Sequence, residues 1–237
     1  MTDPRPARDP ARIEAMFDRI VPHYDLMNRL MTVGLDRRWR AAAADAATPL
    51  PGKPILDACC GTGDLALALA RRYPTSPVTG LDFSQAMLDR ARPKAAHAAA
   101  AVEFVHGDLL ALPFADASFG AITVGWGVRN VADLARAFAE MVRVAAPGAR
   151  VVCLEATTPA GVVGRRFHAV WFERVVPAMG ALVTGDAEAY AYLPASVRSF
   201  PDADGLAAVM GAAGLAHVRY RLFGFGAMAL HVGEVPA

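Results

Sequence analysis

Short apolar runs alternate with longer segments of helical periodicity along most of this chain. The apolar runs predict seven strands, at Pro54–Asp57, Val78–Asp82, Val102–His106, Ala121–Gly125, Arg150–Glu155, His217–Phe223 and Ala227–Val232. The segments between them predict helices at Asp64–Tyr73, Ser84–Ala99, Leu134–Ala145 and Pro201–Ala213. This alternation is typical of an α/β fold with a mostly parallel sheet and helices on both faces. Gly224–Gly226 predicts a hairpin, which makes the final strand antiparallel.

Two helical regions fall outside this alternation. After a polar start, residues 1–47 follow a helical pattern that is interrupted near Pro22 and Gly34. We therefore expect an N-terminal tail and helical lid there, followed by one domain over residues 48–237. Residues 158–198 interrupt the alternation again and predict a mostly helical insert in that domain.

Composition and charge narrow the functional classes. The 237 residues carry a formal net charge of +1, which gives no reason to expect a nucleic-acid partner. Three cysteines do not indicate a disulfide framework, and the N-terminus lacks the apolar core of a secretory signal, so we expect a cytoplasmic protein. The most apolar long stretch, residues 161–185, contains too many charged residues to span a bilayer. It remains compatible with peripheral contact at the inner face of the membrane.

The segment that follows the first predicted strand, ILDACCGTGD at residues 55–64, predicts a ligand-binding turn. Gly61 and Gly63 let a ligand approach the backbone, and the following helix offers free N–H groups at its start. A pyrophosphate-binding turn of the G-x-G-x-x-G type has a third glycine where this chain has Ala66, and Asp64 would repel the phosphates. These departures weaken the alternative of a nicotinamide-dependent oxidoreductase, although they leave it open.

A cofactor that carries an amino-acid group and a positive charge in place of phosphates fits this turn better, and S-adenosylmethionine has both. The segment Asp57–Gly63 resembles the acid-x-G-x-G-x-G motif of class I methyltransferases, with Cys59 in place of the first glycine and Thr62 between the other two. Cys59 and the adjacent Cys60 are poorly placed to chelate one tetrahedral metal ion. We therefore expect both cysteines to be packing residues and expect no metal site.

Two further acids follow predicted strands at the edge where such folds bind ligands. Asp82 ends the second strand about 20 residues after the turn, a position from which an acid binds ribose hydroxyls. Asp108 follows the third strand, and the resemblance to class I methyltransferases implies that it binds the adenine amino group, with a backbone N–H from Leu109. Phe83 and Met87 either pack on the adenine or belong to the core.

The segment before the first strand carries the most specific motif of the chain. The motif residues are Tyr24, Asp25, Met27, Asn28 and Trp39, and further motifs lie at Leu112–Phe119, Gly127–Val131 and Tyr192–Arg198. With these motifs the chain resembles the demethylmenaquinone and ubiquinone-biosynthesis C-methyltransferase family. Thr32 and Asp36 depart from the serine and histidine of that family, and Gly125 stands where some members have a serine near the cofactor.

The resemblance implies a Rossmann-like class I methyltransferase fold. It also implies methyl transfer from S-adenosylmethionine to a ring carbon of a polyprenylated quinol, with S-adenosylhomocysteine as the product. Catalytic positions are implied at Arg129 and Asn130 beyond the fourth strand, and at Tyr24 and Asp25 in the lid. Because ionising a ring hydroxyl makes the adjacent carbon nucleophilic, Arg129 would stabilise the phenolate, unless it serves only in a structural ion pair.

The resemblance leaves the base and the quinone open. His23 and Asp36 are weaker candidates for removing the ring proton, and Tyr190 and Tyr192 either flank the ring or belong to the core. The predicted lid starts by about Arg12, whereas ubiquinone-pathway members usually have a longer extension, so we favour demethylmenaquinol, a prenylated naphthoquinol, as the substrate. The alternatives are the benzoquinol intermediate of ubiquinone synthesis, an O- or N-methyltransferase for another small molecule, and a non-catalytic cofactor-binding subunit. A homodimer is compatible with the sequence.

Overall fold

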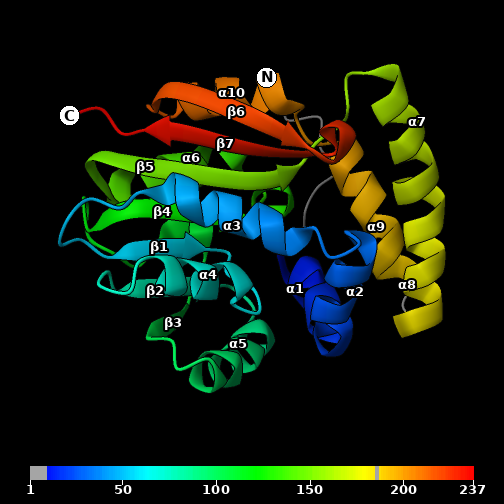
Figure 1. Cartoon of the computed structure of the whole chain (residues 1–237), viewed down its shortest axis with the longest axis horizontal. Helices are drawn as coiled ribbons and strands as arrows, with labels where there is room; N and C mark the ends of the chain where they lie inside the picture. Colours follow the sequence, from blue (N-terminus) through cyan, green and yellow to red (C-terminus); the bar gives the residue numbers. More distant parts are fainter. Residues whose placement is uncertain (1–9, 185–186) are drawn as a thin grey trace.

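A seven-stranded sheet in the order β3-β2-β1-β4-β5-β7-β6 runs through the computed structural model, which describes residues 10–184 and 187–237 (Figure 1). The strands are β1 (Ile55–Ala58), β2 (Val78–Asp82), β3 (Val102–His106), β4 (Phe119–Gly125), β5 (Ala145–Ala156), β6 (Ala216–Phe223) and β7 (Met228–Glu234). Strands β1 to β5 pair in parallel, and β7 runs antiparallel to both of its neighbours. The predicted mostly parallel sheet with an antiparallel final strand is confirmed.

Helices cover both faces of this sheet, and further helices lie at the carboxyl ends of its parallel strands. The described α-helices are α1 (Pro10–Ile20), α2 (Tyr24–Met31), α3 (Asp36–Ala47), α4 (Asp64–Arg72), α5 (Gln85–His97), α6 (Leu134–Val144), α7 (Val162–Val170), α8 (Val176–Thr184), α9 (Ala187–Arg198) and α10 (Ala203–Ala212). Short 3-10 turns lie at Val21–His23, Leu109–Ala111, Val128–Asn130 and Gly224–Gly226. The last of these joins β6 to β7, which confirms the predicted hairpin.

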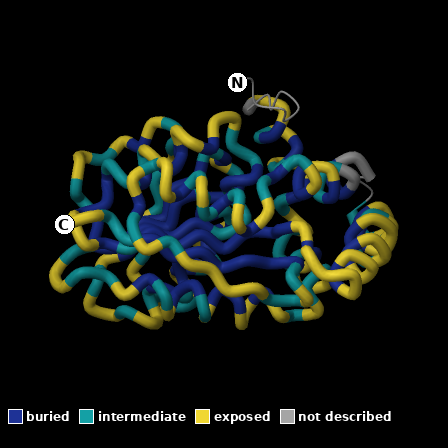
Figure 2. Tube along the Cα trace, turned by 90° about the horizontal axis from the view of Figure 1, so that it is seen from above, coloured by how far each residue is buried: buried dark blue, intermediate teal, exposed yellow. Residues whose placement is uncertain are grey.

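The strand β5 shows how alternate side chains build a core on each face of the sheet. Val152 and Leu154 pack with residues of α3 and α4, whereas Val151 and Cys153 pack with residues of α6 and α10. All four side chains are fully buried. Figure 2 shows the central strands as a buried layer between partly exposed helices. The sheet is therefore a rigid platform, and its carboxyl edge can hold a site.

The start of β5 differs from the prediction. The strand begins at Ala145 instead of Arg150, because Ala145 pairs with Phe119 of β4 before the register shifts. Gly148, with a φ of +80°, turns the chain between the two paired parts. A local pattern that contains Pro147 and Gly148 predicts only a turn, so this early pairing was not visible in the sequence.

The N-terminal segment bends where the sequence predicts. Pro22 lies in the turn between α1 and α2, and Gly34 adopts a φ of +75° between α2 and α3. Helix α3 packs on β4 and β5 and belongs to the layer that covers the sheet. Helices α1 and α2 lie at the carboxyl edge of the parallel strands, where they contact α9 and α8 respectively (Figure 1). We call α1 and α2 the lid.

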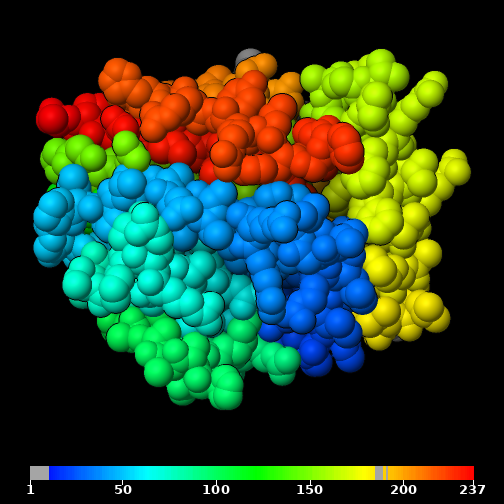
Figure 3. Space-filling view, in the orientation of Figure 1, coloured from blue at the N-terminus to red at the C-terminus, as the bar shows by residue number. Residues whose placement is uncertain are grey.

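The insert consists of α7, a π-helical segment at Trp171–Val175, α8 and α9. It stands beside the lid at the carboxyl edge of the sheet, and Figure 3 shows the two surfaces meeting along one side of the molecule. No helix among the described residues is long and apolar enough to cross a membrane. The mostly helical character predicted for this region is confirmed.

Candidate active site

A cavity of about 330 Å³ opens at the carboxyl ends of the first four strands. Of the predicted cofactor residues, those that line it are Gly61, Asp82, Phe83, Met87, Asp108 and Leu109. Asp57 and Thr62 line a small adjoining cavity of about 30 Å³. Gly63 lines neither cavity. It precedes α4 with a φ of +83°, and a Cβ atom there would lie 3.1 Å from Ala91 and Phe104. The structure thus gathers most of the predicted cofactor residues around two connected spaces, which we call the cofactor cavity and the turn cavity.

Asp82 is held in the wall of the cofactor cavity from two sides. Its Oδ2 accepts a hydrogen bond of 2.7 Å from the Gly61 N–H, and its Oδ1 accepts one of 3.0 Å from the Ser84 N–H. Burial raises the pKa of Asp82 to about 6, although these hydrogen bonds lower it. The carboxylate is therefore fixed in position, and a further hydroxyl donor would favour its ionised form.

The other two predicted acids have different surroundings. Asp57 is fully buried under the turn, where Thr123 Oγ1 donates a hydrogen bond of 2.7 Å to Asp57 Oδ1. Burial raises the pKa of Asp57 to about 7. Asp108 lies at the cavity and caps a short turn by accepting a hydrogen bond of 2.8 Å from the Leu110 N–H. Asp57 thus shapes the turn from below, while Asp82 and Asp108 face the ligand space.

A second, narrower cavity of about 70 Å³ lies beneath the lid, and we call it the lid cavity. Its lining is mostly apolar and aromatic, and includes Phe17, Met27, Phe172, Tyr190, Tyr192 and Met228. Tyr24 and Trp126 line both the lid cavity and the cofactor cavity, so the two spaces meet at these side chains. Burial raises the pKa of the Tyr24 hydroxyl, although the positive charge of Arg129 lowers it. The Tyr24 hydroxyl is therefore a neutral donor at the junction.

Arg129 brings a buried positive charge to the lid cavity. Its Nη1 donates hydrogen bonds of 2.8 Å to Glu155 Oε1 and 2.7 Å to the Trp126 carbonyl. Burial lowers the pKa of Arg129, but Glu155, Tyr24 and Tyr192 together outweigh burial and raise it overall. Its buried Nε–H has no hydrogen-bond partner among the described residues. The structural ion pair weighed for Arg129 thus exists, and it uses only the Nη1 donors of the guanidinium.

Asn130 connects the turn after β4 to the insert. Its Nδ2 donates to the Trp126 carbonyl at 3.3 Å, and its Oδ1 accepts a hydrogen bond of 3.1 Å from the Tyr192 hydroxyl. Asn130 lines the cofactor cavity and Tyr192 lines the lid cavity. The pair therefore helps to separate the two ligand spaces.

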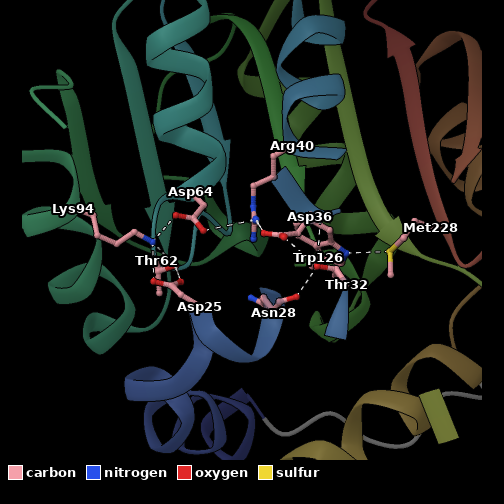
Figure 4. Close-up of polar contacts among 10 residues, drawn as sticks. All are labelled: Asp25, Asn28, Thr32, Asp36, Arg40, Thr62, Asp64, Lys94, Trp126 and Met228. Carbon is pink, nitrogen blue, oxygen red and sulfur yellow. Dashed lines mark hydrogen bonds and ion pairs between the residues drawn. The ribbon is translucent and has the colours of Figure 1, made fainter. Parts of the chain in front are cut away.

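Asp25 lies away from both of these cavities. Its Oδ1 accepts a hydrogen bond of 2.6 Å from Thr62, and its Oδ2 accepts one of 2.9 Å from Lys94 Nζ (Figure 4). Burial raises the pKa of Asp25, but the hydrogen bonds from Thr62 and Lys94 outweigh burial and lower it overall. Asp25 lines an outer groove between α2, α3, α4 and α5. The structure therefore separates it from Tyr24, Asn130 and Arg129, with which the sequence grouped it.

Residues 6–235 match the model of the ubiE/COQ5 methyltransferase family. This chain belongs to that family. Curated relatives cover nearly all of it. A demethylmenaquinone methyltransferase of Thermus thermophilus is 48% identical and covers 93% of this chain and 100% of its own. The ubiquinone/menaquinone biosynthesis C-methyltransferase UbiE of Desulfotalea psychrophila is 41% identical, with 93% and 89% covered.

Solved structures extend the likeness to the fold. A putative S-adenosyl-L-methionine-dependent methyltransferase of Methanococcus maripaludis superposes with a TM-score of 0.64 at 17% identity, covering 93% of this chain and 94% of its own. A SAM-dependent methyltransferase of Thermotoga maritima, described as a possible histamine N-methyltransferase, gives 0.63 at 18% identity, with 93% and 98% covered. Such identities establish the fold alone. The predicted Rossmann-like class I methyltransferase fold is confirmed.

Two residues that the sequence did not indicate, Trp126 and Arg40, occupy the centre of the site. Trp126 lines all three cavities and adopts a φ of +56°, which is unusual for a bulky residue and typical of functional positions. Arg40 lines the lid cavity and the turn cavity, and its guanidinium lies over the Trp126 ring. Trp126 directly follows the fourth strand, and this position could have indicated that it belongs to the site. Arg40 could not be identified in this way, because its contact with the site depends on how α3 packs.

The three cysteines are buried or half-buried packing residues. Burial raises the pKa of Cys59, Cys60 and Cys153 well above the usual thiol value, so all three stay protonated. Cys59 adopts a φ of +56°, and a Cβ atom on Gly127 would lie 2.4 Å from the Cys59 Cβ atom. The turn therefore requires a small residue at both positions, in agreement with the packing role predicted for Cys59.

Proposed function

We propose that this protein transfers a methyl group from S-adenosylmethionine to a ring carbon of a prenylated quinol, most specifically demethylmenaquinol. The observation that carries the proposal is the meeting of two unlike cavities at Tyr24 and Trp126. The cofactor cavity has carboxylates placed for a nucleoside, and the lid cavity is apolar with one buried guanidinium. A nucleoside donor and an aromatic acceptor would meet at this junction.

The residues of the cofactor cavity fit S-adenosylmethionine. Asp82 and Asp108 both line this cavity, so Asp82 would accept hydrogen bonds from the ribose hydroxyls and Asp108 one from the adenine amino group. The buried Leu109 can contribute its backbone N–H, and Phe83 and Met87 provide apolar walls for the adenine. When bound, S-adenosylmethionine supplies an electrophilic methyl group. The cavity volume of about 330 Å³ falls in the range typical of small-molecule sites.

Arg129 is placed to stabilise the charge that forms on the quinol. A ring hydroxyl that loses its proton becomes a phenolate, and its electron density makes the adjacent ring carbon nucleophilic. The Arg129 guanidinium lines the lid cavity and can donate a hydrogen bond to this oxygen. Glu155 and the Trp126 carbonyl hold the guanidinium in place beforehand. Tyr24 would then position the ring at the junction with the cofactor.

The names of the relatives and the apolar lining of the lid cavity both support demethylmenaquinol as the substrate. The relatives of Thermus, Roseiflexus and Deinococcus at 45–48% identity are demethylmenaquinone methyltransferases. A naphthoquinol presents a second fused ring to the apolar lining, whereas a benzoquinol has a single ring and buries less apolar surface there. Competition between short-tailed forms of the two quinols, with S-adenosylmethionine and purified protein, tests the choice. We expect a higher kcat/KM for the naphthoquinol, and a preference for the benzoquinol would contradict it.

We further propose that the insert contacts the membrane surface from which a prenylated substrate is taken. Val162, Val163 and Leu182 are 59%, 72% and 88% exposed, and Arg165 and Arg166 lie exposed between them in the chain. Exposed apolar side chains among basic residues favour an anionic lipid surface. The π-helical segment of the same insert supplies Phe172 to the lid cavity, which connects the contact surface to the ring site.

Flotation with liposomes tests this contact. We expect wild-type protein to float with vesicles of mixed neutral and anionic lipids, and the Val163→Glu/Leu182→Glu variant to remain in the soluble fraction. Leu222→Glu provides the control, because Leu222 is also exposed, at 46%, but lies on the edge strand β6. Absence of the wild type from the lipid fraction, or equal loss in both variants, would contradict the proposed surface.

A further inference from the structure

The turn cavity adjoins the cofactor cavity at the start of α4 and is lined mainly by polar groups. Its charged lining residues are Arg40, Asp57 and Asp64. Gly61 and Trp126 line both cavities, so a ligand that fills the cofactor cavity can extend past them into this space. The extension leads toward charged side chains and away from the acids that face the nucleoside.

Arg40 is the only arginine or lysine among the described residues that line the cofactor cavity or the turn cavity. It is 8% exposed, and its Cζ lies 4.8 Å from the centroid of the Trp126 ring. Asp36, one helical turn earlier in α3, forms an ion pair with its Nη1. The Thr32 hydroxyl lies 3.1 Å from Asp36 Oδ1 and helps to fix that carboxylate. The guanidinium is therefore held rigidly before a ligand arrives.

Asp64 faces Arg40 across the same small space. Its Oδ2 lies 3.7 Å from Arg40 Nη1, and its Oδ1 lies 2.5 Å from Lys94 Nζ. Figure 4 shows the Arg40 guanidinium between Asp64 on one side and Asp36 and Trp126 on the other. A cation and a carboxylate at this separation match the two charges of an α-amino acid.

We propose that Arg40 binds the α-carboxylate and Asp64 the α-ammonium group of S-adenosylmethionine, an assignment that rests on the cofactor proposed above. A carboxylate that enters a buried site needs a cationic or N–H partner, and a fixed guanidinium provides both charge and paired donors. Two cations, Arg40 and Lys94, and three carboxylates, of Asp25, Asp36 and Asp64, form the connected cluster. The cluster carries one net negative charge, and S-adenosylmethionine carries one net positive charge.

Calorimetry with two ligands tests the assignment without any methyl transfer. The ligands are S-adenosylhomocysteine and S-adenosyl-3-thiopropylamine, which differ only in the carboxylate. We expect wild-type protein to prefer S-adenosylhomocysteine by about 10- to 100-fold, as for a charge-assisted hydrogen bond to a buried partner. In Arg40→Gln the preference should fall to about threefold or less, and affinity for the carboxylate-free ligand should change little. Arg40→Lys should retain an intermediate preference.

The ratio of the two affinities is measured within each variant, so a smaller folded fraction affects both ligands equally and does not change the ratio. If Arg40→Gln unfolds because Asp36 loses its partner, Asp36→Asn/Arg40→Gln removes the whole ion pair and should give the same reduced preference. Arg38→Gln changes an exposed arginine of the same helix and should keep the wild-type preference. A wild-type preference that persists without Arg40 would overturn the assignment. Failure of wild-type protein to bind S-adenosylhomocysteine would instead contradict the proposed cofactor.

Discussion

Thr62 of the cofactor turn donates a hydrogen bond of 2.6 Å to Asp25 of the second lid helix. Lys94 of α5 holds the other oxygen of the same carboxylate at 2.9 Å. Asp25 is thus one of the residues that attach the lid to the wall of the site, together with Asp18, which accepts a hydrogen bond of 2.6 Å from the Ser84 hydroxyl. We infer that Asp25 acts as a positioning residue, since it contacts the turn and not the space proposed for the quinol.

Removing this fastening should loosen the lid. In Asp25→Ala the hydrogen bonds from Thr62 and Lys94 are lost, at a cost of about 1–2 kcal/mol for partly buried, charge-assisted bonds. We predict that the amides of α2 exchange about 5- to 30-fold faster with deuterium, while the strands keep their protection. Asp45→Ala breaks an exposed ion pair with Arg72 and should leave α2 exchange unchanged. Unchanged exchange in Asp25→Ala would contradict the fastening role.

Cofactor affinity should depend on pH through Asp82. The pKa of its carboxyl is raised to about 6 in the ligand-free protein, and ribose hydroxyls bind the ionised form. At pH 5 only about one molecule in ten has an ionised Asp82, so the affinity for S-adenosylhomocysteine should fall about tenfold between pH 7.5 and pH 5. Calorimetry over this range measures the effect. In Asp82→Asn the affinity should be lower and the dependence weaker, and an unaltered pH profile would contradict the ribose role.

Stability should respond to pH in the opposite sense. The folded-state pKa values of Asp57 and Asp82 are raised by burial to about 7 and about 6, above the ordinary value near 3.8. A raised carboxyl pKa stabilises the fold at low pH, and this contribution is lost as pH rises through the folded-state pKa. We predict that the melting temperature of ligand-free wild-type protein decreases between pH 5 and pH 8. The decrease should be smaller in Asp57→Asn. A steeper decrease in the variant would show that the sign is wrong.

Arg129 should affect the chemical step more than cofactor binding. Arg129→Lys keeps a positive charge near Glu155 but loses the guanidinium donor, and we predict a kcat reduced about 100- to 1,000-fold, as for the loss of one oxyanion donor. The dissociation constant of S-adenosylhomocysteine should stay within about threefold. Arg129→Gln should in addition destabilise the fold by about 3–5 kcal/mol, because the Glu155 carboxylate is left buried and unpaired. Exposed Arg92 provides the control substitution to Gln.

Two of the three positive-φ positions of the turn, Cys59 and Gly61, should respond differently to substitution. Cys59 and Gly61 adopt φ values of +56° and +54°. Cys59→Gly relieves the strain of a side chain in this conformation, so stability should stay equal or rise by up to about 1 kcal/mol and cofactor affinity should stay near that of wild type. Gly61→Val places a β-branched residue in the strained conformation and a side chain in the cofactor cavity, and should abolish detectable binding of S-adenosylhomocysteine. The reverse outcome would contradict the turn's proposed role.

The layered fold was visible in the sequence because its central strands, such as β2, are buried on both faces. Runs such as Val78–Asp82 and Val102–His106 lie in the structure where the apolar pattern predicts them. The carboxyl ends of parallel strands share one edge, so the residues after these strands, Asp82 and Asp108, could be placed together in advance. The register of the early part of β5 was not visible, because it depends on pairing with Phe119.

The lid residues were harder to assign, because their partners come from distant elements. Tyr24 and Asp25 are neighbours in one motif, yet helical geometry directs Tyr24 to the cavities and Asp25 to α5. Arg40 reaches the site only because α3 packs across β4 and β5. A motif therefore indicated which segment belongs to the site, and tertiary packing decided what each side chain contacts.

The central claim is that the methyl group is transferred to a ring carbon of a quinol, and the position of the transferred methyl group in the product tests this claim most directly. Purified protein is incubated with S-adenosylmethionine labelled with ¹³C in the methyl group and with a reduced, short-tailed demethylmenaquinol, and the product is examined by mass spectrometry and NMR. We predict one labelled methyl group on the ring carbon next to a hydroxyl-bearing carbon, with S-adenosylhomocysteine formed in equal amount. A label found on oxygen, or no labelled quinone although S-adenosylhomocysteine binds, would contradict C-methylation of a quinol.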